Sequence, residues 1–471
     1  MSRINTNISS LQAIHRLNKN NADLSMRLQR LSSGMKINSG KDAPAALIAS
    51  ETLRSEITGI NQAIENSGRA GNVINTAEGA LSEVSSLLLE IQGLTNEAAN
   101  KGALSADEIA ANQLQVDAIL SSINRIANTT QFNGVKLLNG SLDYSSSGVS
   151  NTNIANVRVN SARLPDAAAV NVVVSVTQSA QTAEIGYVSG DLAANNAVTV
   201  QIAGNKGTEQ LSLAGGTTLA QMVTAINAVK NATGVSAATA SAGAKLVLNS
   251  TEYGSEQFVR LTTQSGTFVP SATSDTGRDA AVKVNGASAQ ARGLSISYRS
   301  TNLDLEIDLK NAINITAGST SFYITGGGAN FALGPKVTET DKSSIGLMSM
   351  STGSLGDNTN GFLNTLGSGA TNGLASNNLV TAQRIIDKSI KQVATLRGRL
   401  GAFQKEILES NISSLSVALE NVTASESAIR DADFASETAA MTRAQILVQA
   451  NTSVLAQANS TPQNVLSLLR G

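Results

Sequence analysis

Residues 53–94 read LRSEITGINQAIENSGRAGNVINTAEGALSEVSSLLLEIQGL, and their apolar residues recur every three or four positions. The stripe consists of Leu53, Ile57, Ile60, Ile64, Ala70, Ile74, Ala77, Leu81, Val84, Leu88, Ile91 and Leu94. This spacing is close to a coiled-coil heptad and predicts one long helix over residues 46–100. At 1.5 Å per residue, that helix is a rod of roughly 80 Å. Such a rod buries its stripe only against other helices.

Both ends of the chain carry the same helical pattern. A first helix is predicted over residues 4–32, and Pro44 fits the first turn of the long helix. A third helix over residues 109–127 runs back antiparallel to the long one. A last helix is predicted that carries Met441, Ala444, Leu447, Val448, Val454, Leu455 and Ala458. The stripe before it comprises Leu379, Ile386, Val393, Leu396, Leu400, Phe403, Ile407, Leu415, Leu419 and Val422.

The middle of the chain has a different composition. From about Leu137 it is rich in Ser, Gly, Asn, Thr and Val, with alternating runs at residues 170–176 and 198–202 that predict strands. One helix is predicted within it, over residues 218–227, which indicates a small α+β module. The predicted fold class is therefore α+β and multidomain. Long coiled-coil-like helical rods form from paired N- and C-terminal segments, and the insert between them is mainly β.

The near-zero net charge argues against partners that are attracted by the overall electrostatic field of the protein, such as nucleic acids. The chain has 34 basic and 35 acidic residues and a formal net charge of -1, so we expect no nucleic-acid binding. No segment reaches membrane-spanning length, so we expect no membrane insertion. The first helix is locally basic, and its cations are interpreted as a solvated face: Arg3, Arg16, Lys19, Arg27 and Arg30.

The residues for common catalytic chemistry are missing. The chain has no cysteine and one histidine, His15, which is interpreted as a packed or interface residue. A zinc-protease helix needs two histidines four residues apart, and the glycine runs lack the Lys-Ser/Thr ending of a phosphate loop. Asp431 and Asp433, beside Arg430, are interpreted as capping and ion-pairing residues. We therefore expect no enzyme activity, no cofactor and no metal.

Several motifs are more specific than periodicity. They occur in the order Ile4-Asn5-Thr6-Asn7, Leu31-Ser32-Ser33-Gly34, Ile37-Asn38-Ser39-Gly40-Lys41-Asp42, Gln131-Phe132-Asn133-Gly134, Ile429-Arg430-Asp431-Ala432-Asp433-Phe434-Ala435, Leu455-Ala456-Gln457-Ala458-Asn459 and Pro462-Gln463-Asn464-Val465-Leu466. In this order they closely resemble bacterial flagellin, over about the first 140 and the last 100 residues. Residues 218–227 and 246–248 also resemble the flagellin insert module.

The resemblance implies a structural subunit that polymerises into a flagellar filament for swimming. It implies a filament-core helix at 1–42, outer-tube helices and a hairpin at 43–165, and a surface-exposed insert at 166–330. An outer-tube helix at 331–428 and a second core helix at 429–471 complete the division. The residues expected to pack in the filament core are Ile4, Ile8, Leu11, Leu24, Leu28, Leu31, Leu447, Val454, Leu455, Leu466 and Leu469.

The resemblance also implies location and partners. Composition alone favours a cytoplasmic protein because no cleavable signal is visible. A flagellin is instead exported unfolded by the flagellar type III apparatus and becomes part of the extracellular filament. Its implied partners are further copies of itself, an export chaperone, the filament cap and the hook-filament junction proteins.

A host receptor is a further implied partner. The region that resembles the contact of the flagellin-sensing Toll-like receptor includes Leu88, Glu90, Gln92, Leu94 and Glu97. Receptor-active flagellins typically carry arginine at the position of Glu90. Reversing a charge at an interface leaves the opposing group repelled or unpaired. We therefore expect weak receptor stimulation.

Three alternatives remain open from the sequence. A hook-filament junction protein shares the end helices with flagellin. A host-directed adhesion module would place a glycan or protein site in residues 170–328. A hydrolase in the insert would depend on scattered carboxylates such as Glu252 and Asp304.

Overall fold

The computed structural model describes residues 6–100, 102–164, 169–187, 190–240, 245–316, 318–358, 360–376 and 378–470, and the side chains of all of these except 315–316 and 462–470. The chain forms two compact units. Unit 1 comprises Met1–Arg69, Ala332–Asp341 and Glu406–Gly471, and unit 2 comprises Ala70–Phe331 and Lys342–Lys405.

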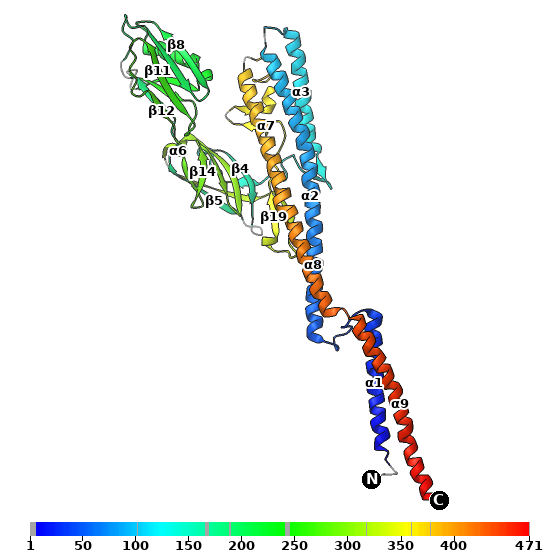
Figure 1. The fold of residues 1–471 in the computed structure, drawn as a ribbon. Coiled ribbons are helices and arrows are strands. Elements are labelled where there is room, and N and C mark those ends of the chain that lie inside the picture. The colour runs from blue at the N-terminus through cyan, green and yellow to red at the C-terminus, as the bar shows by residue number, and fades with distance from the viewer. Residues whose placement is uncertain are drawn as a thin grey trace. The chain divides into compact units, whose positions relative to one another are not determined.

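Unit 1 consists mainly of two antiparallel helix pairs. Helix α1 (Ile8–Ser33) lies along α9 (Phe434–Arg470), near both termini in Figure 1. Asn7 Nδ2 donates to the Ala458 carbonyl at 2.8 Å, near the start of α1. The first part of α2 (Pro44–Ala99) lies along α8 (Ser410–Arg430), where Ser50 Oγ donates to Glu426 Oε1 at 3.1 Å. The predicted pairing of N- and C-terminal helices is confirmed.

The starts and ends of these helices follow from local sequence. Asn7 caps α1, because its side chain accepts a hydrogen bond from the Ser10 amide at 3.0 Å. Gly34 ends α1 with φ at +72°, a left-handed conformation that favours glycine. Helix α2 begins at Pro44, as predicted, where the missing amide hydrogen has no intrahelical partner to lose.

The C-terminal rod consists of α7 (Leu379–Ala402), a π-helix and α8, and its stripe of buried residues shifts in phase along the rod. The seven-residue π-helix (Phe403–Glu409) joins α7 to α8. Leu396, Leu400 and Phe403 are buried at the spacing of an α-helix, but the next buried residue is Leu408. The prediction of Ile407 in this stripe was wrong, since its side chain is 40% exposed. A π turn holds one more residue than an α turn, and this moves the buried stripe by one position.

Three helices of unit 2 form a bundle. Helix α3 (Ala106–Thr129) runs back along α2, as predicted, and α7 lies along the same part of α2 (Figure 1). Arg397 Nε on α7 donates to Glu78 Oε1 on α2 at 2.8 Å. The residues buried in these helices include Leu81, Val84, Leu88, Ile91, Val116, Ile123, Ile386, Val393 and Leu396.

After α3, β1 (Gln131–Phe132) and β2 (Val135–Lys136) form a hairpin. Its turn residues Asn133 and Gly134 both have positive φ.

The insert contains an eight-stranded antiparallel sheet with the strand order β3-β17-β5-β13-β14-β15-β16-β4. The strands are β3 (Ser145–Ser147), β17 (Ser319–Gly326), β5 (Val170–Gln178), β13 (Ala281–Val284), β14 (Ala287–Arg292), β15 (Ser295–Arg299), β16 (Leu303–Leu309) and β4 (Ile154–Ala162). Its core includes Val172, Val174, Leu305, Ile307 and Phe322. Strands β3 and β4 precede residue 166, so the sheet takes strands from both sides of the domain limit expected at 165/166.

A second module is inserted between β5 and β13. It contains the sheets β6-β10-β9 and β12-β11-β7-β8 around Ile202, Met222 and Leu248. Its elements are β6 (Glu184–Tyr187), β7 (Val198–Gly204), β8 (Gly207–Leu213), α4 (Leu219–Ala228), α5 (Lys230–Thr233), β9 (Val235–Ala240), β10 (Lys245–Ser250), β11 (Phe258–Ser265) and β12 (Ser274–Thr276). The α+β order predicted here is confirmed.

Short elements connect the insert to the C-terminal rod. They are α6 (Asn311–Thr316), β18 (Ala329–Ala332), the 3₁₀ turn Glu339–Asp341, β19 (Lys342–Ile345), β20 (Gly356–Asp357), β21 (Gly361–Phe362) and the 3₁₀ turn Leu363–Leu366. The buried side chain of Gln392 on α7 holds β20 in place. It accepts from the Gly356 amide at 2.9 Å and donates to the Gly356 carbonyl at 2.7 Å. Strand β20 is therefore fixed to the helical bundle.

Deleting Ile407 tests the origin of the phase shift. The deletion places Phe403 and the former Leu408 four positions apart, so a continuous α-helix then serves both halves of the stripe. We expect stability within about 1 kcal/mol of the parent chain, because no buried side chain is lost. Deleting the exposed Thr395 in α7 is the matched control. It rotates Leu396, Leu400 and Phe403 out of the bundle and should cost roughly 3 kcal/mol or more. Thermal unfolding followed by circular dichroism measures both, and equal destabilisation by the two deletions would contradict this origin.

Candidate functional site

The contact between α1 and α9 follows a heptad on each helix. The covered or half-covered positions are spaced alternately by three and four residues, as in a coiled-coil seam. They are Ser10, Ala13, Leu17, Asn20, Leu24, Arg27 and Leu31 on α1, and Glu437, Met441, Ala444, Val448, Asn451, Leu455 and Ala458 on α9. Small and polar residues hold about half of these positions. The pair therefore buries little apolar surface on its own.

Apolar side chains one or two positions away from the seam residues face solvent. Leu11 on α1 is 59% exposed, and Val454 on α9 is 55% exposed. The other exposed members are Ile8, Ile14, Leu28, Ile446 and Leu447. Exposed apolar side chains that gather on two paired helices are a candidate interaction surface in a soluble protein. We call these seven residues the outer flanks.

The predicted filament-core residues fall into two groups. Leu24, Leu31 and Leu455 are half-buried at the seam between α1 and α9. The outer flanks contain the second group: Ile8, Leu11, Leu28, Leu447 and Val454. Ile4 and the side chains of Leu466 and Leu469 lie outside the described residues. The sequence pattern therefore mixed residues that pair the two helices with residues that remain open.

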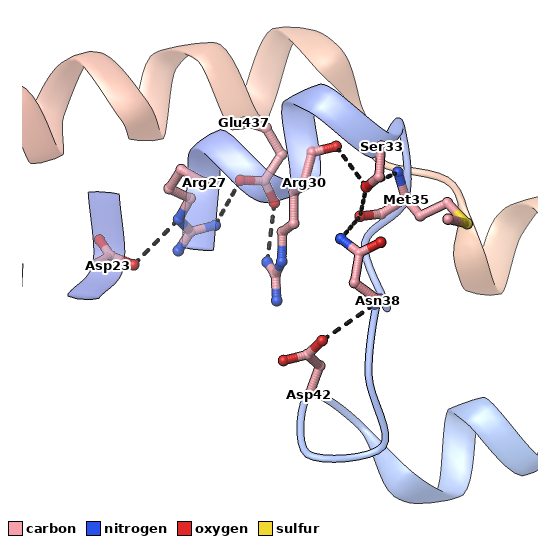
Figure 2. A network of polar contacts seen from close by, with 8 residues as sticks. All are labelled: Asp23, Arg27, Arg30, Ser33, Met35, Asn38, Asp42 and Glu437. Carbon is pink, nitrogen blue, oxygen red and sulfur yellow. Dashed lines mark hydrogen bonds and ion pairs between the residues drawn. The ribbon is translucent and has the colours of Figure 1, made fainter. Parts of the chain in front are cut away.

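A buried carboxylate connects the two helices at one end of the seam (Figure 2). Glu437 Oε2 accepts from Arg27 Nη1 at 2.8 Å, and Glu437 Oε1 accepts from Arg30 Nη1 at 3.1 Å. The Glu437 side chain is 11% exposed. The hydrogen bond from Arg27, assisted by that from Arg30, lowers the pKa of Glu437 below its ordinary value. Glu437 is therefore held ionised between two arginines.

The sequence interpretation of the basic face of α1 was wrong for Arg27 and Arg30. Both cations are paired with Glu437 on α9 rather than solvated, and Arg27 also contacts Asp23 at 3.3 Å. Sequence reasoning missed Glu437. The available signal was an acidic residue at a seam position of the last helix, seven residues before Ala444. Arg27 at a seam position of α1, with Arg30 one turn further on, is its natural complement.

Paired backbone segments connect the two helix pairs of unit 1, and we call residues 34–43 and 430–433 the joint. The Lys36 amide donates to the Arg430 carbonyl at 2.7 Å, and the Ala432 amide donates to the Gly34 carbonyl at 2.9 Å. The Asp42 carboxylate accepts from the Asn38 amide at 3.2 Å, part of the network in Figure 2. The joint is therefore an ordered structure.

The capping role expected for the aspartates of the joint is seen at Asp433, but the ion pairing expected with Arg430 was wrong, since Arg430 pairs with Glu51 and Glu426. Asp433 caps α9, accepting from the Ala435 amide at 3.0 Å and from the Ser436 amide at 3.3 Å. Asp431 accepts from Ser427 Oγ. His15, expected to be a packed or interface residue, is exposed on α1 within this chain.

The expected receptor-contact residues are divided by burial. Leu88 is fully buried and Leu94 is 9% exposed, so both are core residues of the bundle and were wrong as surface contacts. Their positions on the inward stripe of α2 explain this. Gln92 is half-buried and donates to Asp387 Oδ1 at 3.0 Å. Glu90 and Glu97 are exposed.

Two further features of the described residues bear on function. Within the ranges that the structure describes, no group of three or more His, Cys, Asp or Glu side chains is arranged to hold a metal ion. In the same ranges, every helix is too short or too polar to cross a membrane.

Known families match most of the helical sequence. The bacterial flagellin N-terminal helical region matches residues 4–143, and the bacterial flagellin C-terminal helical region matches residues 383–469. The flagellin hook IN motif matches residues 199–252, within the module inserted between β5 and β13. The three matches agree with the segments that the motifs identified.

Relatives cover nearly the full chain. It is 30% identical to polar flagellin B/D of Vibrio parahaemolyticus over 466 residues, with 99% of each chain covered. It is 31% identical to the flagellin of Salmonella typhimurium over 518 residues, again with 99% of each covered. The structure of FliC from Burkholderia pseudomallei is 17% identical over 71% of this chain and 98% of that chain, with a TM-score of 0.24 that carries no structural argument. With relatives of this identity over almost its whole length, the chain belongs to the bacterial flagellin family, the structural subunits that polymerise into the flagellar filament.

Proposed function

We propose that polymerisation proceeds by burial of the outer flanks of α1 and α9 against neighbouring copies. The observation that supports this most directly is the exposure of Leu11 and Val454 beside a seam that is filled with small and polar residues. In this proposal Leu24, Leu31 and Leu455 hold the two helices of one subunit together. Ile8, Leu11, Leu28, Leu447 and Val454 contact other subunits, together with Ile4, Leu466 and Leu469.

The energies are adequate for a polymer. Burying one Leu, Ile or Val side chain contributes about 1.5–3 kcal/mol. Association costs about 4–15 kcal/mol in lost motion. The outer flanks provide enough side chains to exceed this cost when several neighbours share the contact. The ends of an isolated subunit lack these neighbours, so their helices are weakly held.

We assign the parts of the chain to layers of the filament as the resemblance implies. Residues 1–42 and 429–471 form the core, residues 43–165 and 331–428 form the outer tube, and residues 166–330 are displayed outside. The pairing of β3 and β4 with later strands supports moving these two strands to the displayed part. The chain is secreted through the flagellar type III apparatus with the help of an export chaperone. It meets the filament cap and the hook-filament junction proteins, and it catalyses no reaction.

We also propose weak stimulation of the host flagellin receptor. Glu90 is exposed on α2 and accepts a hydrogen bond from Gln115 Nε2 on α3 at 3.4 Å. A receptor surface that complements arginine at this position meets a negative charge instead. Like charges at an interface reduce affinity by several kcal/mol when desolvated.

Val454→Asp tests the outer flanks. A carboxylate buried at a contact between subunits has no partner, so we expect secreted monomer but no filaments. Thr452→Asp is the matched control, because Thr452 lies on a polar, exposed part of the same helix. Electron microscopy and sedimentation of the secreted protein give the readout. Normal filaments from Val454→Asp, or their loss in both variants, would contradict the assignment.

Glu437→Gln tests the pairing of α1 with α9 through pH. The folded-state pKa of Glu437 is lowered, so its contribution is fully present above its unfolded value of about 4.3 and is lost as pH falls through the folded pKa. We expect the variant to lose about 1–3 kcal/mol of the free energy that holds α1 to α9 at neutral pH. The stability of this pairing should also depend less on pH below about 4.3 in the variant than in the parent chain. The exposed Glu420→Gln is the control. Filament disassembly against pH measures the effect, and identical profiles for Glu437→Gln and the parent would count against it.

Glu90→Arg tests the receptor proposal. Restoring the cation should increase signalling in a receptor reporter assay, because the interface charge again matches. Glu83→Arg, another exposed position on α2, controls for added positive charge. Equal, strong signalling by the parent and Glu90→Arg would refute the proposal.

A further inference from the structure

One aromatic side chain of unit 1 faces solvent. The chain has eight phenylalanines, all in the described part, and Phe434 is the exposed one, at 70%. It is the first residue of α9. The capping bonds of Asp433 and the bond from the Ala432 amide to Gly34 fix the backbone beside it. Phe434 is therefore an exposed aromatic side chain on a fixed backbone, and aromatic side chains are enriched at protein interfaces.

An open groove lies on the other helix pair of the same unit. It has a volume of about 620 Å³ and is lined by Leu47, Ile48, Glu51, Thr52, Ser55, Glu56, Pro335 and Lys336. Ile48 is 69% exposed. Glu51 is paired with Arg54 at 3.0 Å and with Arg430 at 3.2 Å, so its charge is already compensated. The groove thus combines three apolar side chains with polar and charged ones.

The wall opposite α2 is held firmly. Pro335 lies against α2 at Gly59, where an added Cβ would be 2.5 Å from the Pro335 carbonyl oxygen. Asn411 Nδ2 on α8 donates to the Leu333 carbonyl at 2.8 Å. The Leu333 amide donates to the Asp341 carbonyl at 2.8 Å. These contacts build a fixed groove that Phe434 of the same chain leaves open.

We propose that Phe434 of one copy inserts into this groove of the next copy. The inference rests on the proposed function, because it names a contact within the polymer. The inserted side chain and the groove are different surfaces of one unit, so their contact is head-to-tail. Contacts of this type generate open helical filaments when the rotation does not close a ring. Both surfaces are exposed in a single chain and become buried together.

Charge supports this occupant. The lining carries three charged residues: Glu51 is already paired, Glu56 is exposed, and Lys336 makes no ion pair with any residue in the described ranges. Asp433, adjacent to Phe434, is an exposed residue whose carboxylate caps α9 through Oδ1. Insertion of the ring places this carboxylate near the groove that carries the Lys336 ammonium. The phenyl ring contacts Leu47, Ile48 and Pro335, and the charges set its direction.

Crosslinking between different chains tests the contact. The chain has no cysteine, so Phe434→Cys and Ile48→Cys introduce single thiols. The two variants are copolymerised onto filament seeds of the parent chain and treated with a short bifunctional thiol reagent. We expect a heterodimer on denaturing gels. Thr452→Cys mixed with Ile48→Cys is the control and should give none.

The energetic test uses Phe434→Ala and Phe434→Leu. We expect the alanine variant to raise the critical concentration for seeded polymerisation roughly tenfold or more, and the leucine variant to raise it less. Monomer unfolding should be unchanged for both, because the side chain is exposed. A missing heterodimer with parent-like polymerisation of Phe434→Ala would overturn this contact alone. Failure of the parent chain to polymerise would overturn the proposed function itself.

Discussion

The helical ends carry more apolar surface than two helices can bury against each other. Helices α1 and α9 share one seam, and small or polar residues such as Ala13, Asn20, Ala444 and Asn451 occupy many of its positions. The larger aliphatic side chains stand beside this seam and remain exposed. Hydrophobic burial is therefore incomplete within a single chain. The ion pairs of Glu437 with Arg27 and Arg30 define the register of the pair without adding to its apolar contact.

The chain is organised as nested antiparallel pairs. Helix α1 pairs with α9, and the first part of α2 pairs with α8. The second module of the insert begins where the chain leaves the eight-stranded sheet after β5, and it ends where the chain returns to that sheet at β13. At that last point the Gln181 amide donates to the Arg278 carbonyl at 2.8 Å, and the Arg278 amide donates back at 3.0 Å. Each inner pair lies, in sequence, between the two members of the pair outside it.

Local signals predicted the helices well. Pro44 and the heptad stripes located α1, α2, α3 and α9, and the α+β order of the inner module was evident from its alternating runs. The π-helix also had a signal, because Ile407 and Leu415 are eight residues apart, where a heptad requires seven. The pairing of β3 and β4 with distant strands had no comparable signal. Strand register depends on partners far away in sequence, and the chain around residue 150 does not specify them.

The candidate site was predicted in part. Periodicity identified Leu24 and Val454 as apolar stripe residues but did not distinguish the seam from the flank, because the two differ by one residue in phase. Glu437 was missed because a charged residue breaks the apolar pattern by which a seam is recognised. Only knowledge of its partners on α1 identifies it as a seam residue. Leu88 and Leu94 were assigned by resemblance to a surface region, although their phase on α2 directs them inward. Burial separates these cases, and burial depends on the neighbouring helices.

A helical reconstruction of the polymer formed by the purified chain tests the central claim most directly. The account predicts that Leu11, Leu447 and Val454 contact neighbouring subunits and lose their solvent exposure. It also predicts that the pairing of α1 with α9 persists within each subunit. Filaments in which these three side chains remain exposed to solvent would contradict it.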